Sequence, residues 1–333
     1  MNKNYISKCS DFLENEFNKK VLMVSSGTAA LELSAYLLNI NKNDEVIVPS
    51  YTYISTASAF AKFGATIKFV DIKSIDMNID EKKIEAAITK KTKAIIAVHY
   101  NGVPCNMDKI IKISKKYNLK IVEDNAQGAF VKYKNKYLGT FGDYGCFSFQ
   151  KLKNFNCSEG GAITLNTEEE YAKALDYINC GSNRYDFYNN KVQNYSWQFV
   201  GSNYRMNEIA AKVLYKQFLH KNKIIKKRIS LWNKYYNYLH KYYNCCSFCG
   251  SANNFFIICE NDEQKKKLIN KYKLTTHFYP ALHNTKAGKQ LGKFIGQDKN
   301  TTKLSNLLLR LPMYKKQQRK IIKGLLNERN NGK

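Results

Sequence analysis

The sequence predicts an α/β protein whose core is a mostly parallel sheet covered by helices. Through the first 165 residues, short apolar runs of strand length alternate with segments of helical periodicity. Strands that are buried on both faces read as continuous apolar runs, which is typical of a parallel sheet. Ligands of such sheets bind at the carboxyl ends of the strands, so candidate functional residues are expected there.

The expected strands are short apolar runs that end at a polar or turn-forming residue. The first of them, EVIVPS, is closed by Pro49, and KIVED ends at the acidic Asp124. In order, the expected strands are 45–50, 66–72, 93–99, 120–124, 146–149 and 161–165. The expected helices are 11–19, 28–38, 55–63, 81–88 and 107–117, and leucines recur along the second of them.

The pattern changes after about residue 205, where a long helical stretch rich in lysine and tyrosine begins. This part is expected to contain a helix at 207–243, a strand at 255–259, a helix at 263–272, an extended segment at 277–282, and helices at 301–308 and 317–326. We therefore expect a large α/β domain at 1–205 and a smaller α+β domain at 206–333.

The chain is strongly basic, with 54 lysines and arginines against 27 aspartates and glutamates, a net charge of +27. Such an excess attracts nucleic acid, anionic lipid or phosphorylated small molecules. Because lysine and asparagine are frequent throughout the chain, most of the excess is interpreted as a bias in amino-acid composition. No run approaches the roughly 20 apolar residues that span a bilayer. The first residues also lack the apolar region of a secretory signal. We expect a cytoplasmic protein that binds neither membrane nor nucleic acid.

Nine cysteines are scattered along the chain, and this odd number favours reduced thiols over a disulfide framework. Cys246 and Cys249 have the spacing of half a zinc site and lie close in sequence to Cys245 and Cys259. A second CxxC pair or a nearby pair of histidines is missing. We therefore expect no metal site.

Small polar residues precede the helix expected at 28–38. Ser25, Ser26, Gly27 and Thr28 form a turn whose free N–H groups and positive helix end suit a phosphate. The same residues are also ordinary helix caps, so both interpretations remain open for this turn taken alone.

Three further residues suggest a cofactor site when they are taken together. Asp124 ends a strand, Ser148 lies in a strand-like run, and Lys153 follows Ser148 five residues later. A carboxylate for a protonated ring nitrogen, a hydroxyl for a phosphate and a lysine for an aldehyde are the parts of a pyridoxal phosphate site. Each residue also has an ordinary role in a turn or on the surface, and Lys151 competes with Lys153.

Eight motifs that occur in one order along the chain resemble the DegT/DnrJ/EryC1/StrS family of nucleotide-sugar aminotransferases. They are SSGTAAL, DEVIVPSYTYISTASAF, GATIKFVDI, KTKAIIAVHYNGVPCNMD, IVEDNAQGA, LGTFGDYGCFSFQKLKN, EGGAI and GSNYRMNEIAA. The resemblance covers about residues 10–326. It implies the aspartate aminotransferase-like fold, known as fold type I, and pyridoxal 5′-phosphate as cofactor.

The resemblance implies a role for each matched position. Lys153 would bind the cofactor and move the proton, and Asp124 would pair with the ring nitrogen. The other implied cofactor contacts are Ser26, Gly27, Thr28 and Ser148 at the phosphate, Tyr53 on the ring face, Gln127 near the phenolic oxygen, and Asn203 at the cofactor phosphate of a neighbouring subunit. Arg184, Tyr279 and His283 are implied as contacts to the sugar nucleotide or to glutamate, beside a purely structural role.

Segments 181–206, 278–283 and 301–314 resemble the branch that aminates nucleotide-linked 4-keto-6-deoxyhexoses. This branch implies a dTDP- or UDP-linked substrate, glutamate as donor, a role in glycan biosynthesis, and a homodimer with shared sites. Lys153 favours transamination, because relatives that deoxygenate C3 carry histidine there. A 3-aminotransferase, a dehydratase and a nucleic-acid-binding regulator on this scaffold remain alternatives.

Two departures from the family pattern are a short segment before the first helix and Ser158 in place of a glycine.

Overall fold

A computed structural model describes residues 4–247, 249–274 and 279–330, and its largest element is an eight-stranded sheet. The strands are β1 (Lys20–Val24), β2 (Glu45–Pro49), β3 (Thr66–Val70), β4 (Thr92–Val98), β5 (Lys120–Asp124), β8 (Tyr144–Ser148), β9 (Gly161–Leu165) and β12 (Gly292–Phe294). Their order is β1-β9-β8-β5-β4-β2-β3-β12. The pairs from β8 to β12 are parallel, and β9 pairs antiparallel with both β1 and β8. The prediction of a mostly parallel sheet is therefore confirmed.

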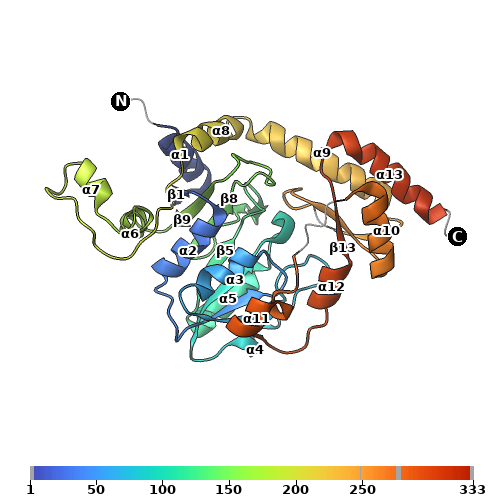
Figure 1. Cartoon of the computed structure of the whole chain (residues 1–333), viewed down its shortest axis with the longest axis horizontal. Helices are drawn as coiled ribbons and strands as arrows, with labels where there is room; N and C mark the ends of the chain where they lie inside the picture. Colours follow the sequence, from blue (N-terminus) through green and yellow to red (C-terminus); the bar gives the residue numbers. More distant parts are fainter. Residues whose placement is uncertain (1–3, 248, 275–278, 331–333) are drawn as a thin grey trace.

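Helices cover both faces of this sheet (Figure 1). They are α1 (Tyr5–Phe17), α2 (Gly27–Leu37), α3 (Ile54–Ala61), α4 (Ile84–Ala87), α5 (Met107–Tyr117), α6 (Glu168–Ile178) and α8 (Glu208–Phe218). Side chains of α2, α3 and α6 share one buried cluster with the strands. Those of α1 and α8, and those of α4 and α5, form two clusters with the strand residues that point the other way. This alternation along each strand explains why the sheet is apolar on both sides.

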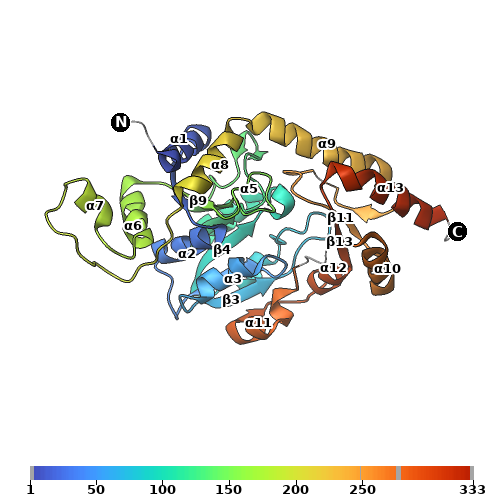
Figure 2. The same ribbon diagram turned by 45° about the horizontal axis from the view of Figure 1, so that its top comes forward.

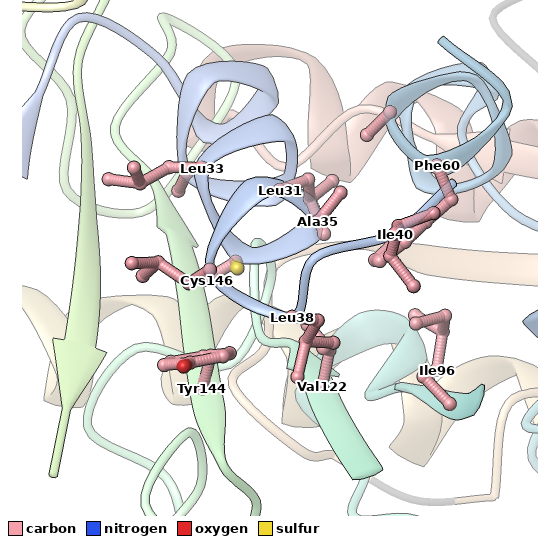
Figure 3. Close-up of a cluster of buried hydrophobic side chains, with 14 of the residues drawn as sticks. Leu31, Leu33, Ala35, Leu38, Ile40, Phe60, Ile96, Val122, Tyr144 and Cys146 are labelled. Carbon is pink, nitrogen blue, oxygen red and sulfur yellow. The ribbon is translucent and has the colours of Figure 1, made fainter. Parts of the chain in front are cut away.

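The cluster beneath α2 illustrates how the predicted helix and strands meet (Figure 3). Leu31 and Leu33 leave α2 on opposite sides and belong to one buried cluster with Val122 of β5 and Cys146 of β8, both of which are fully buried. Burying each such leucine contributes about 1.5–3 kcal/mol relative to leaving it exposed. Because this cluster fixes α2 on the sheet, it also fixes the turn that precedes the helix.

The C-terminal part forms a second core around a small antiparallel sheet. Its elements are α9 (Lys221–Leu239), β10 (Asn244–Cys245), β11 (Phe255–Ile258), α10 (Asp262–Tyr272), α12 (Thr301–Leu307), β13 (Leu308–Leu311) and α13 (Lys315–Asn330). The strands are ordered β10-β11-β13, and their core includes Trp232 and Tyr235 of α9. The remaining elements are a two-stranded sheet of β6 (Lys132–Tyr133) and β7 (Lys136–Tyr137), the helices α7 (Arg184–Tyr188) and α11 (Lys286–Leu291), and the 3-10 helices η1 (Tyr100–Gly102) and η2 (Leu282–Asn284).

The helix expected at 81–88 is shorter, Ile84–Ala87, and three further predicted elements differ from the structure for identifiable reasons. The first helix begins at Tyr5 instead of residue 11, because the side chain of Asn4 accepts a hydrogen bond from the Ser7 N–H and caps it. The single helix expected at 207–243 is two helices that join different cores, α8 the core of α1 and α9 the C-terminal core. The helix expected at 301–308 ends at Leu307, where β13 begins and pairs with β11. The extended segment expected at 277–282 lies partly outside the described residues.

The C-terminal half also contributes to the large sheet. Strand β12 pairs with β3, and α8 packs against α1. The division of the chain at residue 205 stays a prediction. The segment with α6 and α7 projects to one side, whereas α9, α10 and α13 gather at the opposite end (Figures 1 and 2). Among the described residues, no helix combines the length and the apolar character that crossing a lipid bilayer requires.

Candidate active site

A cavity of about 410 Å³ lies at the carboxyl ends of the parallel strands. This is the edge where α/β proteins bind ligands, and the volume falls within the roughly 300–1,000 Å³ of small-molecule sites. The cavity wall includes nearly all of the residues predicted to contact the cofactor. They are Ser26, Gly27, Thr28, Tyr53, Asp124, Gln127, Ser148 and Lys153, and Tyr279 joins them from the C-terminal half.

The turn before α2 forms the end of the cavity that suits a phosphate. Ser26 caps the helix by accepting a hydrogen bond from the Ala29 N–H. The N–H groups of Gly27 and Thr28 precede the first bonds within the helix, so they are available to an anion. A Cβ on Gly27 would lie 2.8 Å from the Cβ of Ser148. Only glycine therefore lets the helix end approach Ser148 closely enough to form one cradle with it.

Asp124 lies in the middle of this edge as a buried carboxylate, with 5% of its surface exposed. Its Oδ2 accepts a hydrogen bond from Thr56 Oγ1 at 2.7 Å, and its Oδ1 accepts one from the Ala126 N–H at 3.2 Å. Among the described residues no cation pairs with it. A buried carboxylate without a cation is expensive unless a ligand supplies the positive charge. A protonated pyridine nitrogen meets this requirement, so Asp124 fits pyridoxal phosphate.

Lys153 lies in the loop 149–160, which leaves the sheet after β8 and returns to it at β9. Hydrogen bonds between the two ends of the loop hold it closed, from the Phe149 N–H to the Gly160 carbonyl and from the Cys157 N–H to the Phe149 carbonyl. Ser158, at a φ of 73°, has the left-handed backbone that glycine adopts without strain. The departure from the family pattern at this position therefore coincides with a strained turn beside the lysine.

Gln127 is fixed by three polar neighbours. Its Oε1 accepts hydrogen bonds from the Asn101 N–H at 2.8 Å and from Asn254 Nδ2 at 3.2 Å, and its Nε2 donates to Tyr279 Oη at 3.0 Å. Tyr279 and Asn254 both come from the C-terminal half and line the cavity. The two halves of the chain therefore close the cavity together. Tyr53, in contrast, is 56% exposed at the start of α3, and its ring lies 5.8 Å from that of Tyr279.

Three predicted contacts do not line the cavity. Asn203 is exposed on the segment before α8, where its Oδ1 accepts a hydrogen bond from Arg205 Nε. Arg184 begins the projecting helix α7 and stacks on Tyr188. His283 binds the Oγ of Ser50 through Nδ1 at 2.6 Å and lies 3.2 Å from Asp298 through Nε2. Its position links the end of β2 to the C-terminal half, which is a structural role.

The substitution His283→Gln is expected to reduce the loss of stability on acidification. Burial lowers the pKa of His283 below 6.5, although the nearby Asp298 opposes this effect. The folded protein therefore binds this proton less readily than the unfolded chain, and the contribution of His283 to stability declines as the pH falls below the unfolded pKa. Between about pH 7.5 and 5.5, circular dichroism should show the Tm of the unmodified protein falling about 1–2 °C further than that of the variant. Equal losses would contradict this assignment.

Several residues of the site were not predicted from the sequence. His99 follows β4 and lines the cavity, and its position at a strand end was the available signal. It pairs with the buried Glu123 at 2.9 Å, while its Nδ1 accepts a hydrogen bond from the Cys105 N–H. Arg310 also lines the cavity, and a charged residue within the leucine run of β13 was a signal for it. Nothing in the sequence apart from its place on α3 indicated that Thr56 donates a hydrogen bond to Asp124.

Neither cysteine nor metal chemistry is indicated in the described part of the chain. No group of three or more histidines, cysteines, aspartates or glutamates there could hold a metal ion. Burial raises the pKa of Cys157, the cysteine of the lysine loop, to about 12. It also raises that of Cys246 to about 12. Both thiols are therefore protonated near neutral pH and are poor nucleophiles.

The fold is that of the pyridoxal-phosphate-dependent transferases of fold type I, and Lys153, Asp124 and the turn before α2 line one cavity that fits this cofactor. The chain belongs to the DegT/DnrJ/EryC1/StrS aminotransferase family, whose model matches residues 4–327. The predicted resemblance is thereby confirmed. Membership also confirms the predicted cofactor, because aminotransferases of this family depend on pyridoxal 5′-phosphate.

Curated relatives match part of the chain. GDP-perosamine synthase from Escherichia coli O157:H7 is 39% identical over 212 residues, which are 63% of this chain and 56% of the relative. A UDP-N-acetyl-3-dehydro-alpha-D-glucosamine 3-aminotransferase from Acidithiobacillus ferrooxidans is 38% identical over 59% of this chain and 51% of the relative. The chain thus spans about half the length of the curated relatives that it matches.

Solved structures match almost the whole chain. A DegT DnrJ EryC1 StrS aminotransferase from Brucella abortus superposes with a TM-score of 0.89 at 24% identity, covering 99% of this chain and 91% of that one. DesV from S. venezuelae, solved in complex with a ketimine intermediate, superposes with a TM-score of 0.87 at 25% identity, covering 97% and 88%. These matches confirm the predicted fold.

Proposed function

We propose that this protein transfers an amino group from glutamate to the 4-keto group of a nucleotide-linked 4-keto-6-deoxyhexose. The product would be a 4-amino-4,6-dideoxy sugar for glycan biosynthesis. The observation that carries this proposal is the convergence of Lys153, Asp124 and the turn before α2 on one cavity. Two GDP-perosamine synthases among the relatives, at 39% and 37% identity, support a sugar nucleotide as substrate.

Each of the three groups has a distinct task in this proposal. When bound, pyridoxal phosphate supplies an electron sink for the carbon that carries the reacting amine. Lys153 Nζ would take a proton from Cα of the amino donor and later return one to the sugar carbon. Asp124 would hold the proton on the ring nitrogen, and the N–H groups of Gly27 and Thr28 would bind the phosphate.

The test is to supply purified protein with glutamate, the cofactor and one keto sugar at a time. The sugars are dTDP-, UDP- and GDP-linked 4-keto-6-deoxyhexoses, and a UDP-linked 3-keto sugar represents the chemistry of the 3-aminotransferase relative. We expect a 4-amino sugar detected by NMR, with one 2-oxoglutarate formed for each product. Turnover of the 3-keto sugar alone would replace the proposal with a 3-aminotransferase. Loss of water from the keto sugar without consumption of glutamate would indicate a dehydratase.

We also propose that the protein acts as a homodimer. Asn203 is exposed and lies outside the cavity of its own chain, which suits a contact to a neighbouring subunit. Large apolar side chains on the same part of the chain are exposed, with 74% for Trp197, 78% for Val200 and 79% for Ile209. Large apolar side chains that are exposed on one segment of the chain favour an interaction surface there. A molar mass of one subunit, measured by light scattering, would exclude this assembly.

A further inference from the structure

Arg310 is a partly buried cation in the wall of the active-site cavity. It lies on β13, opposite Phe256 of β11. Its Nη2 donates a hydrogen bond to Tyr100 Oη at 3.1 Å, and its guanidinium lies 4.4 Å from the centre of the Tyr279 ring. The buried Nε has no hydrogen-bond partner. Among the described residues, no carboxylate forms an ion pair with Arg310.

The groups around Arg310 do not balance its charge. Burial raises the pKa of Tyr51 well above its usual range and also raises that of Tyr100, so both phenols remain neutral. The guanidinium itself stays charged at every physiological pH. A partly desolvated charge without a counter-ion is unfavourable, and the buried Nε–H that has no hydrogen-bond partner adds to the cost. An anionic ligand bound at the guanidinium would supply the negative charge that these neighbours do not provide.

Arg310 is on the opposite side of Asp124 from the phosphate cradle. The cradle is formed by residues at the ends of β1 and β8, whereas Tyr51 and Tyr100, which pack around Arg310, follow β2 and β4. Strand β5, which ends in Asp124, lies between these two pairs of strands. The cavity therefore has two separate positions for anions. The first suits the cofactor phosphate, which leaves Arg310 for a different group.

We propose that Arg310 binds a carboxylate of the amino donor, an inference that rests on the proposed transamination. The flat guanidinium offers paired N–H groups that match the two oxygens of a carboxylate. Because Arg310 shares the cavity with Lys153, a donor held at its carboxylate would present its amine toward the reacting lysine. Tyr279 would hold the guanidinium in place from one side, and its bond to Gln127 would keep that ring fixed.

Calorimetric titration of the cofactor-loaded protein with glutarate tests this proposal without requiring turnover, because glutarate has two carboxylates and no amine. Arg310→Met should weaken glutarate binding by about 10–100-fold, the range expected for charge-assisted hydrogen bonds, and Arg310→Lys should weaken it less. Binding of dTDP, UDP and GDP should not change. Unchanged glutarate binding in Arg310→Met, or weakened nucleotide binding in place of weakened glutarate binding, would overturn the proposal.

The matched control is Arg228→Met, which removes a largely buried arginine outside the cavity. The guanidinium of Arg228 donates to the carbonyls of Ala252, Asn253 and Met313, so its loss should lower the Tm and leave glutarate affinity unchanged. Arg310→Met should leave the Tm of the ligand-free protein equal or higher, because an unbalanced charge is removed. If Arg310 served packing alone, its variant would instead lose stability and keep its glutarate affinity. A lack of keto-sugar turnover in the unmodified protein would refute the proposed function without altering the glutarate result.

Discussion

Lys153→Ala is expected to abolish amino transfer, with kcat reduced by about 10⁴-fold, near the upper end of the effect of a positioned proton-transfer group. The variant loses both the amine that holds the cofactor covalently and the group that moves the proton. We expect glutamate to leave the absorption spectrum of the variant unchanged, whereas it should bleach the yellow colour of the unmodified protein. Stopped-flow absorbance after mixing with glutamate measures this difference directly.

Lys151→Ala is the matched control for this experiment, because Lys151 lies in the same loop but does not line the cavity. Its N–H donates to the Ser158 carbonyl, and this backbone bond survives the substitution. We expect normal bleaching and nearly normal kcat. If Lys151→Ala were inactive and Lys153→Ala active, the assignment of the reacting lysine would be reversed.

Asp124→Asn is expected to lower kcat by about 10²–10³-fold, as for the loss of one preorganised electrostatic contact in an active site. The carboxylate is buried and has no cationic partner among the described residues, so its charge is available to a ring nitrogen. Asparagine has nearly the same shape and can still bond to Thr56, and the fold should therefore survive. The measurement is kcat together with a pH titration of the absorbance of the bound cofactor.

Thr56→Val separates the charge of Asp124 from its orientation. This change removes the hydroxyl donor to Oδ2 and keeps the carboxylate. We expect a smaller loss of activity, of about tenfold, which corresponds to one hydrogen bond. Equal losses in Thr56→Val and Asp124→Asn would mean that orientation matters as much as charge.

The fold class could be predicted because most strands of the parallel sheet are largely apolar runs between helices; β12, which reads Gly-Lys-Phe, is an exception and was missed. The sequence pattern indicated secondary structure less clearly at the chain ends and in short strands. The strand β1 lies between two predicted helices and was missed, although its residues Val21–Val24 are apolar and buried. The strand β13 follows α12 without an intervening loop, so its first residue, Leu308, was assigned to the helix expected at 301–308. Pairing with β11 decides its conformation, and local periodicity cannot show such a partner.

Candidate site residues at the ends of strands could be located from the sequence. Residues that reach the cavity from the other half of the chain could not. Asp124 and Ser148 end β5 and β8, and the strand rule places both at one edge. Arg310 reaches the same cavity from β13, in the other half of the chain, and only the packing of the two halves shows this. The resemblance implied His283 as a contact to the sugar nucleotide or to glutamate, whereas in the structure its Nδ1 is hydrogen-bonded to Ser50 Oγ and the side chain does not line the cavity.

The pairing of β8 with the antiparallel β9 has a consequence for the order in which the site is assembled. These two strands are close in sequence, and the loop 149–160 between them is closed by backbone bonds. Contacts of short sequence separation have a small loop-closure entropy and form early in folding. The lysine loop is therefore a local hairpin that can form before the rest of the site. The turn before α2 and Arg310 are far away in sequence, so we expect the lysine to be in place first and the binding cavity to be completed last.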